Sequence, residues 1–292
     1  MTAVAADPAT PASDPATGAG TVLAGASARS LLVTALGELV WPDARPVWTT
    51  TLVRVLQGVG VEEQTARQAI ARAASSGWIA PERHGREVRW TLTPTLVDIF
   101  ATGSRRVEAL AEPYTDWDGT WLAAVVTVPS SHRAARRPLY AGLTWAGFGN
   151  PSPGLWLSPH AERVDEVRRL VVELDLTAYT VCLAGRLDET VGLDEADVVR
   201  RGWDLAALTG HYGDVLAAVQ ALRPRGADAV LAAHLRLLST YREFPRTDPQ
   251  LPEALLPDWI GRRVARVVEA QRRRWQADVR RHVAALDAEV SA

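Results

Sequence analysis

The side chains best suited to recognise another molecule lie on one face of a segment that runs from Glu62 to Gly77. Gln64, Arg67, Gln68, Ala71, Arg72 and Ser75 follow the i, i+3, i+4, i+7 spacing of a single helix face. An arginine can donate two hydrogen bonds to O6 and N7 of guanine, and a glutamine can pair with N6 and N7 of adenine. This face therefore has the chemistry needed to read base edges in a major groove, although an ordinary amphipathic surface helix would show the same spacing.

A second group of polar side chains surrounds Gly85, just downstream. Arg83, His84, Arg86 and Arg89 lie between two short β-like runs at residues 78–80 and 88–92, so we expect them at the tip of a hairpin. There they could reach a phosphate backbone or a minor groove. Residues 64–89 contain five arginines and two glutamates, a local net charge of +3.

Three helical patterns must position these groups. Residues 28–41, 49–60 and 62–77 each carry apolar residues at helical spacing, and in the third of them Ala66, Ala69, Ile70 and Ala73 form a small apolar face that can pack on the second. Three helices followed by a hairpin is the order of a winged helix-turn-helix. A winged helix can also bind protein instead of DNA, so a protein-interaction module remains an alternative.

The middle and last parts of the chain have different patterns. Residues 114–190 alternate as strand, helix, two short strands, helix and strand, a βαββαβ order that predicts a ferredoxin-like α+β domain. From about residue 193 the patterns are helical, interrupted by a connector over residues 245–259 whose four prolines predict a rigid, extended path. In the last helix eight arginines oppose two acids between Gly261 and Arg281, either as a solvated face over an apolar stripe or as a second surface for phosphates.

Composition excludes several classes of protein. The chain has 292 residues and a formal net charge of −2, which argues against a protein that coats nucleic acid by bulk charge but not against a local basic patch. Its single cysteine, Cys182, permits neither an intrachain disulfide nor a multi-cysteine metal site, and a reducing cytoplasm fits best. No apolar run reaches the ~18–20 residues that span a bilayer. Residues 1–26 lack the features of a signal peptide, and we expect a disordered arm.

Enzyme motifs are missing where they would be expected. The six histidines form no H-x-x-x-H pattern, there is no G-x-S-x-G elbow, and GFGNPSPG has the wrong spacing for a dinucleotide loop. The first strand of the middle segment ends at residues 126–129 without a carboxylate that could hold a nuclease metal. Cys182 lies in the last strand of that segment, where we expect a buried structural thiol. The sequence therefore predicts no enzyme, no metal and no cofactor.

Five segments, taken in order, resemble PaaX-type transcriptional repressors of phenylacetic acid catabolism. They read SARSLLVTALGELVW, ARQAIARAASSGWIAPERHGREVRWTLTP, WDGTW, GLTWAGFGNPSPGLWLSP and YREFPRTDPQLPEALLPDWIGRRVAR, and the resemblance extends from Ser27 to Leu286. It implies a winged helix, a central ferredoxin-like domain similar to Cas2, and a helical C-terminal domain. With the pattern above, it predicts a disordered arm over residues 1–26 and domains over 27–110, 114–190 and 193–292.

The resemblance also implies a function. It predicts a dimeric bacterial repressor that binds inverted-repeat operator DNA in the cytoplasm and is released by an aryl-CoA such as phenylacetyl-CoA. Arg67, Arg72, Gly77 and Trp78 match the family's recognition helix and following strand, and Arg86 matches its wing turn, whereas Gln68 departs from the family pattern. The predicted DNA-binding residues are Gln64, Arg67, Gln68, Ala71, Arg72, Arg83, Arg86 and Arg89.

An aryl-CoA site needs an aromatic slot and arginines for phosphates. Two clusters satisfy this chemistry and would form a slot at a domain junction, although packing at a hinge would explain them equally well. Their members are Trp41, Arg45 and Trp48 in the first cluster and Tyr114, Trp117 and Trp121 in the second. A related regulator of another pathway, with a different effector, remains open.

Overall fold

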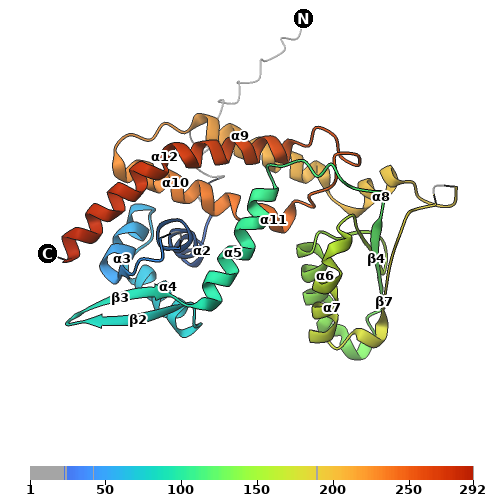
Figure 1. Ribbon diagram of the computed structural model, residues 1–292, viewed down its shortest axis with the longest axis horizontal. Coiled ribbons are helices and arrows are strands. Elements are labelled where there is room, and N and C mark those ends of the chain that lie inside the picture. Colours follow the sequence, from blue (N-terminus) through green and yellow to red (C-terminus); the bar gives the residue numbers. More distant parts are fainter. Residues whose placement is uncertain (1–22, 24, 42, 189, 292) are drawn as a thin grey trace, which may run out of the picture.

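The computed structural model of the protein describes residues 23, 25–41, 43–188 and 190–291 (Figure 1). The predicted arm over residues 1–26 falls mostly outside this range. Leu23, Gly25 and Ala26 are the exceptions, and the side chain of Leu23 is buried in the N-terminal core and only 4% exposed. The described fold therefore begins before the predicted boundary at residue 27.

The N-terminal part consists of helices with a small sheet. Its elements are α2 (Ala28–Ala35), the π-helical segment η1 (Leu36–Val40), β1 (Val47–Trp48), α3 (Thr49–Gly58), α4 (Glu63–Ser75), β2 (Ile79–His84), β3 (Glu87–Leu92) and α5 (Pro94–Ala109). Ser27 caps α2, since its hydroxyl oxygen accepts a hydrogen bond from the amide of Ser30 at 3.1 Å. The three strands pair antiparallel in the order β1-β3-β2.

The hairpin is longer than its sequence predicts. Strand pairing runs from Ile79 opposite Leu92 to His84 opposite Glu87, so only Gly85 and Arg86 form the turn. Gly85 has a φ of +61°, which a glycine adopts without steric cost and which a two-residue hairpin turn requires. The polar residues between the two short predicted runs are thus part of the strands, not of a loop.

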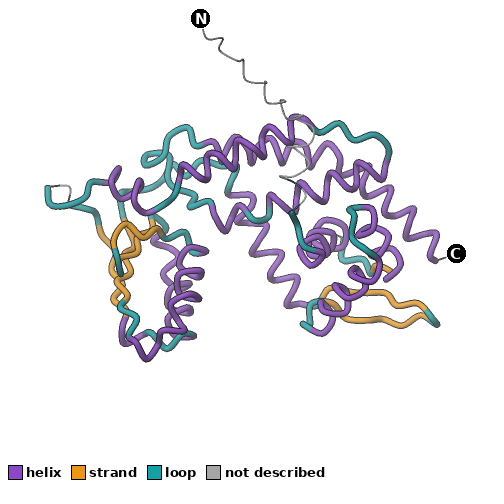
Figure 2. The backbone as a smooth tube through the Cα atoms, turned by 180° about the vertical axis from the view of Figure 1, so that it is seen from behind, coloured by secondary structure: helices purple, strands orange, loops and turns teal. Residues whose placement is uncertain are grey.

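The central part is a four-stranded sheet with helices on one face. Its elements are β4 (Trp121–Val126), η2 (Ser130–Ala135), α6 (Arg136–Trp145), β5 (Gly149–Ser152), β6 (Leu155–Ser158), η3 (Ala161–Arg163), α7 (Val164–Glu173), η4 (Thr177–Tyr179) and β7 (Thr180–Gly185). The strand order is β5-β6-β4-β7, and every neighbouring pair is antiparallel. Helices α6 and α7 cover one face of the sheet (Figure 2). On that face Leu122 and Ala124 of β4 share a core with Leu139 and Leu143 of α6.

The C-terminal part is helical. It comprises α8 (Glu195–Gly202), α9 (Leu205–Ala221), α10 (Ala227–Tyr241), α11 (Phe244–Thr247) and α12 (Ile260–Ser291). Part of the proline-rich connector is helical, contrary to the prediction of an extended path. Pro245 lies in the first turn of α11, where a proline's missing N–H has no helical partner to lose.

One hydrophobic core joins the N-terminal and C-terminal parts. It contains Leu32 of α2, Leu56 of α3, Leu235 of α10 and Val268 of α12, all buried. Helix α12 crosses α10, and its C-terminal end lies beside α3 (Figure 1). The predicted domains over 27–110 and 193–292 therefore pack as one helical body, while the central sheet unit has its own core.

The thiol of Cys182 is exposed, so the prediction of a buried structural cysteine is wrong. The strand that carries it, β7, is an edge strand, and its apolar neighbours Val181 and Leu183 are 61% and 54% exposed. Their alternation resembles that of a core strand, but no described element covers that side of β7. No helix in the described part of the chain is long and apolar enough to cross a membrane.

Candidate nucleic-acid interface and ligand cavities

Helix α4 divides into the two predicted faces. Ala66, Ala69, Ile70 and Ala73 are buried in the core, so this side holds the helix against its neighbours α2 and α3. The other side is exposed along its whole length. Its predicted DNA-binding residues are Gln64, Arg67, Gln68, Ala71 and Arg72.

The two arginines on this face differ in whether they form an ion pair. The Nε of Arg67 lies 2.9 Å from a carboxylate oxygen of Glu63, one helical turn away, and both side chains are about half exposed. Arg72 makes no ion pair with any residue that the structure describes. Because the carboxylate of Glu63 would repel phosphate, Arg72 is the more available cation on the helix.

At the hairpin, Arg83 and Arg86 are exposed beside the turn, as predicted. Arg89 is not at the tip, contrary to the prediction, because the longer strands place it opposite Trp48 and Glu82 in the middle of the hairpin. Its guanidinium carbon lies 4.7 Å from the centre of a Trp48 ring, a cation–π arrangement. Arg89 therefore stabilises the packing of the hairpin on β1.

The two predicted aromatic clusters lie in different parts of the molecule. Trp41 packs against Phe100 in the helical core, with ring centres 6.0 Å apart. Trp117 and Trp121 form an edge-to-face pair at 5.4 Å in a separate cluster beneath α8, and Trp121 is only 2% exposed. The two clusters thus belong to different cores. For Trp121, the alternative explanation holds, because its side chain serves packing and lines no slot.

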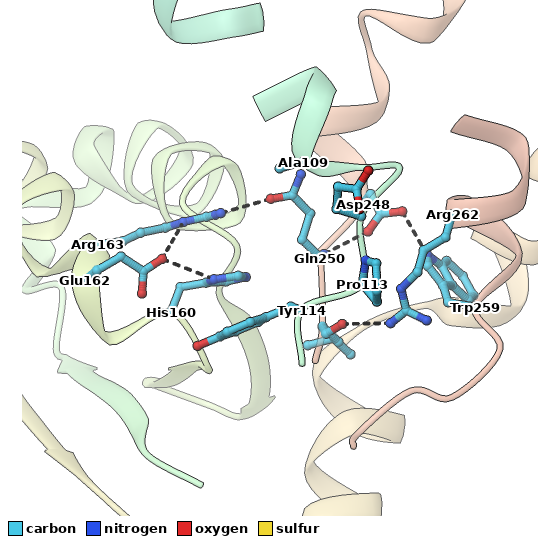
Figure 3. A pocket seen from close by; sticks show the side chains of 12 residues that line it. Ala109, Pro113, Tyr114, His160, Glu162, Arg163, Asp248, Gln250, Trp259 and Arg262 are labelled. Atoms are coloured by element: carbon cyan, nitrogen blue, oxygen red, sulfur yellow. Dashed lines mark hydrogen bonds and ion pairs between the residues drawn. The ribbon is translucent and has the colours of Figure 1, made fainter. Parts of the chain in front are cut away.

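Tyr114, the remaining member of the second cluster, lines a cavity of about 420 Å³ at the junction of the helical body and the central unit (Figure 3). Its ring stacks on that of His160, with centres 5.4 Å apart. Glu162 lies 3.3 Å from Nδ1 of His160 and 3.7 Å from Nε of Arg163. The hydrogen bond with His160 holds the pKa of Glu162 below its usual value against the opposing effect of burial.

The proline-rich connector forms the opposite wall of this junction cavity. Arg163 donates to the Gln250 side chain at 3.0 Å, which joins the central unit to the connector. Buried Asp248 accepts hydrogen bonds from the Tyr212 hydroxyl at 2.9 Å and from the Trp259 indole at 2.8 Å. Burial, and then the nearby Asp248 carboxylate, raise the pKa of Tyr212. The sequence analysis missed these residues, although they lie within the segment YREFPRTDPQLPEALLPDW or contact it.

The arginines of α12 are not one uniform surface. Arg262 is buried and donates to the carbonyl oxygens of Leu251 and Leu256 at 3.1 and 3.2 Å, and Arg272 pairs with Glu38 of η1 at 3.1 Å. Others, such as Arg273 and Arg274, are exposed. Fewer of the eight arginines therefore face solvent than the sequence alone indicates.

A further cavity, of about 490 Å³, lies between the last turns of α12 and residues 39–55. Arg45 lines it and is the member of the first predicted cluster found there. Among the described residues, no group of three or more histidine, cysteine or acidic side chains could hold a metal ion.

An exposed helix with arginine and glutamine side chains, beside a basic hairpin on a helical body, is typical of DNA-binding regulators. Three family models match in order: "PaaX-like protein" over residues 27–96, "PaaX protein central Cas2-like domain" over 114–198 and "PaaX-like protein C-terminal domain" over 203–285. The chain belongs to the PaaX family, as its sequence predicts. Its mixed α and β architecture therefore includes a central Cas2-like domain between helical N-terminal and C-terminal parts.

Individual proteins with known names are also similar to this chain. The transcriptional repressor PaaX of Escherichia coli is 26% identical over 247 residues, which cover 80% of this chain and 76% of that protein. Homology to a transcriptional repressor indicates a regulator rather than an enzyme, as predicted. The solved structure of the uncharacterized protein Rv0674 from Mycobacterium tuberculosis matches with a TM-score of 0.59 and 24% identity, covering 88% of this chain and 98% of that chain, and this likeness concerns the fold alone.

Proposed function

We propose that the protein is a transcriptional repressor whose residues 27–110 act as a winged helix-turn-helix, with α4 as the recognition helix and the β2–β3 hairpin as the wing. The observation that carries this proposal is the exposed side of α4, which presents amide and guanidinium groups while its alanines hold it against α2 and α3. A helix supported on one side and polar on the other can enter a major groove, which is wide enough to admit it.

The predicted contacts divide by their roles. Gln64, Gln68 and Arg72 have the donors and acceptors for base edges, and Ala71 provides a small apolar contact between them. Arg83 and Arg86 fit phosphate contacts beside the helix, where they fix its register without reading sequence. Arg89 supports the hairpin through its contact with Trp48 of β1, and it contributes to DNA binding through the orientation of the wing.

The finer architecture belongs to the same proposal. We divide the chain into the winged-helix domain, a ferredoxin-like domain over residues 114–190 and a helical domain over 193–292. The support for the ferredoxin-like domain is the strand order β5-β6-β4-β7 together with the helices α6 and α7 on one face.

A repressor of this kind acts as a homodimer on an inverted repeat, with its recognition helices about 34 Å apart. The surface for a second copy is the part of the sheet face opposite α6 and α7 that α8 leaves uncovered, where Val125 and Val181 are paired neighbours, 42% and 61% exposed, and Leu183 adds further apolar area. Mass measurement in solution should give a dimer, and Val181→Asp should shift it towards monomer. A dimer unaffected by this change would place the interface elsewhere.

The proposal for the regulated genes and the effector rests on the resemblance to the PaaX family. We propose an aromatic-acid operon of the phenylacetate type, controlled in the cytoplasm and released by an aryl-CoA such as phenylacetyl-CoA. Another pathway and effector, or a partner protein in place of DNA, are the competing possibilities. Mobility shifts with the adjacent promoter and a panel of acyl-CoA esters separate the pathways, and no release by any aryl-CoA would remove this effector class.

The DNA proposal is tested by binding to the promoter at several salt concentrations. Arg72→Ala should weaken binding about tenfold or more and relax the choice of base, because a bidentate base contact is lost. Arg86→Ala should weaken all sequences alike and lower the salt slope by about one. Arg168→Ala, an exposed arginine of α7, is the control. If both variants bound every duplex as the wild type does, the protein-interaction alternative would replace the proposal.

A further inference from the structure

The cavity beside α12, which we call the helix-end cavity, joins the proposed DNA-binding domain to the C-terminal helix. Its volume of about 490 Å³ lies within the range of small-molecule sites. One wall comes from residues 39–55, which include the start of α3, and the other from the last turns of α12. Its occupant would therefore touch both parts at once.

The floor of the helix-end cavity is apolar. Val40, Val47, Leu52 and Val55 are all buried, with exposed fractions between 0 and 7%, and Val283 of α12 faces the same space. An apolar group placed here would lose its contact with water, which is the main source of binding free energy for such a surface.

The rim of the cavity is cationic. Arg45, Arg280 and Arg281 line it together with two carboxylates, Asp43 and Asp287. Asp287 accepts a hydrogen bond from the Thr51 hydroxyl at 2.7 Å, and Arg281 pairs with Asp278 of its own helix. One carboxylate and one arginine are thus already engaged, whereas Arg45 and Arg280 form no ion pair with a described residue.

Arg280 is the rim cation that the protein itself satisfies least. It forms no ion pair with a described residue, and its Nε is shielded from solvent and donates no hydrogen bond within the described part of the chain. An anionic oxygen satisfies a guanidinium better than any neutral acceptor. Because the shielded Nε has no surface open to the cavity, an anion there would pair with the rest of the guanidinium group of Arg280, which lines the wall.

We propose that the helix-end cavity binds an organic anion with an apolar portion, which lies on the valine and leucine floor while its charged group pairs with Arg280 and Arg45. A free aromatic or aliphatic carboxylate and an acyl-CoA thioester both combine an apolar portion with anionic groups. The free acid carries its charge beside the apolar portion, whereas the acyl group of the thioester is neutral and its phosphates would have to reach Arg45 and Arg280 from the rim. The binding itself is independent of the proposed function, and only its regulatory consequence depends on it.

That consequence follows from the links across the cavity. Thr51 of α3 bonds Asp287 of α12, and Arg54 pairs with Glu289 at 2.6 Å. Helix α3 packs directly on α4, so a ligand that favours a different separation of α3 and α12 also favours a different position of the recognition helix. Binding of the anion should therefore lower affinity for DNA.

Calorimetry on the full-length protein tests the site with phenylacetyl-CoA, CoA alone and phenylacetate as probes. Arg280→Ala should reduce the affinity of the bound probe at least tenfold, and Arg280→Lys should restore part of it. Arg274→Ala, an exposed arginine on the same helix outside the cavity, should change nothing. Circular dichroism confirms that each variant folds, and Arg45→Ala provides a second variant at an exposed position.

The outcomes are distinct. Binding of the thioester alone, or of the free acid alone, supports the site and identifies the source of the anion. No binding of any probe, or binding that Arg280→Ala and Arg45→Ala leave unchanged, overturns the proposal. Mobility shifts without ligand test the repressor function separately, so a protein that binds the anion but no DNA would retain this site and lose the proposed function.

Discussion

Glu63 and Arg67 lie one helical turn apart on the exposed side of α4, and in the proposed complex their ion pair would compete with DNA for the same guanidinium. We expect Glu63→Gln to strengthen binding to the promoter roughly two- to fivefold, because it frees Arg67 and removes a charge that repels phosphate. Titration of labelled duplex at low salt measures the change. In an Arg67→Ala background the same substitution should give a smaller gain, and an equal gain in both backgrounds would mean that the ion pair does not compete with DNA.

At the scale of single residues, a buried carboxylate also makes the stability of the folded protein depend on pH. Glu38 of η1 is 4% exposed and lies 3.3 Å from His234 and 3.1 Å from Arg272. Burial favours its neutral form, but the close contact with His234 and the charge of Arg272 outweigh that effect, so the pKa of Glu38 is lower than usual. The ionised carboxylate thus stabilises the folded state above the ordinary pKa of a glutamate, and this contribution is lost as pH falls through the lowered value.

Replacing this carboxylate tests whether its negative charge stabilises the folded state. Glu38→Gln should lower the free energy of unfolding by about 3 kcal/mol at pH 7, because it leaves buried partners without their charge. The difference from the wild type should shrink as pH is lowered towards 4. Urea unfolding at several pH values measures both, and Glu173→Gln, an exposed residue at the end of α7, serves as the control. A difference that grows on acidification would contradict the assignment.

At the scale of elements, Thr49, the first residue of α3, connects that helix to the β2–β3 hairpin. Its hydroxyl donates to the carbonyl oxygen of Val88 at 3.0 Å and accepts from the Trp90 indole at 2.8 Å. Thr49→Val keeps the shape but removes both bonds, so we expect faster amide hydrogen exchange in β3 and weaker binding to DNA. Thr50→Val, whose hydroxyl makes one exposed contact of 3.5 Å with Glu87, should have the smaller effect. Equal exchange in the two variants would show that Thr49 does not hold the hairpin.

The elements also show which features a sequence can predict. The two faces of α4 follow from helical periodicity alone, because four small apolar residues at the right spacing have only one way to be buried. The surroundings of Val181 and Leu183 do not follow, since an alternating apolar strand has the same pattern whether a second layer covers it or not. Glu38 is a similar case, because the partners that accompany its burial, His234 and Arg272, lie on two helices that are distant in the sequence.

For the whole molecule, the sequence patterns indicate three consecutive units, but contacts between distant parts decide how they assemble. Ser30 and Ser239 share a hydrogen bond of 2.9 Å, Arg242 donates to the carbonyl oxygen of Val33 at 3.1 Å, and the Tyr241 hydroxyl donates to that of Val107 at 3.3 Å. Periodicity within one segment carries no information on such pairs. The predicted slot of two aromatic clusters failed for this reason, because closeness to a boundary along the chain does not bring side chains together.

The shared core leads to a prediction about folding. A fragment of residues 23–111 would expose Leu32, Leu56 and other residues that α10 and α12 cover in the full chain, so we expect it to lose cooperative unfolding and most of its helix. A fragment of residues 114–190 keeps its own core between β4 and α6 and should unfold cooperatively. Circular dichroism during thermal unfolding of both fragments measures this difference. A stable, cooperative fragment 23–111 would show instead that the N-terminal part folds without α12, and the C-terminal helices would then be a cover that a ligand could displace without unfolding the DNA-binding unit.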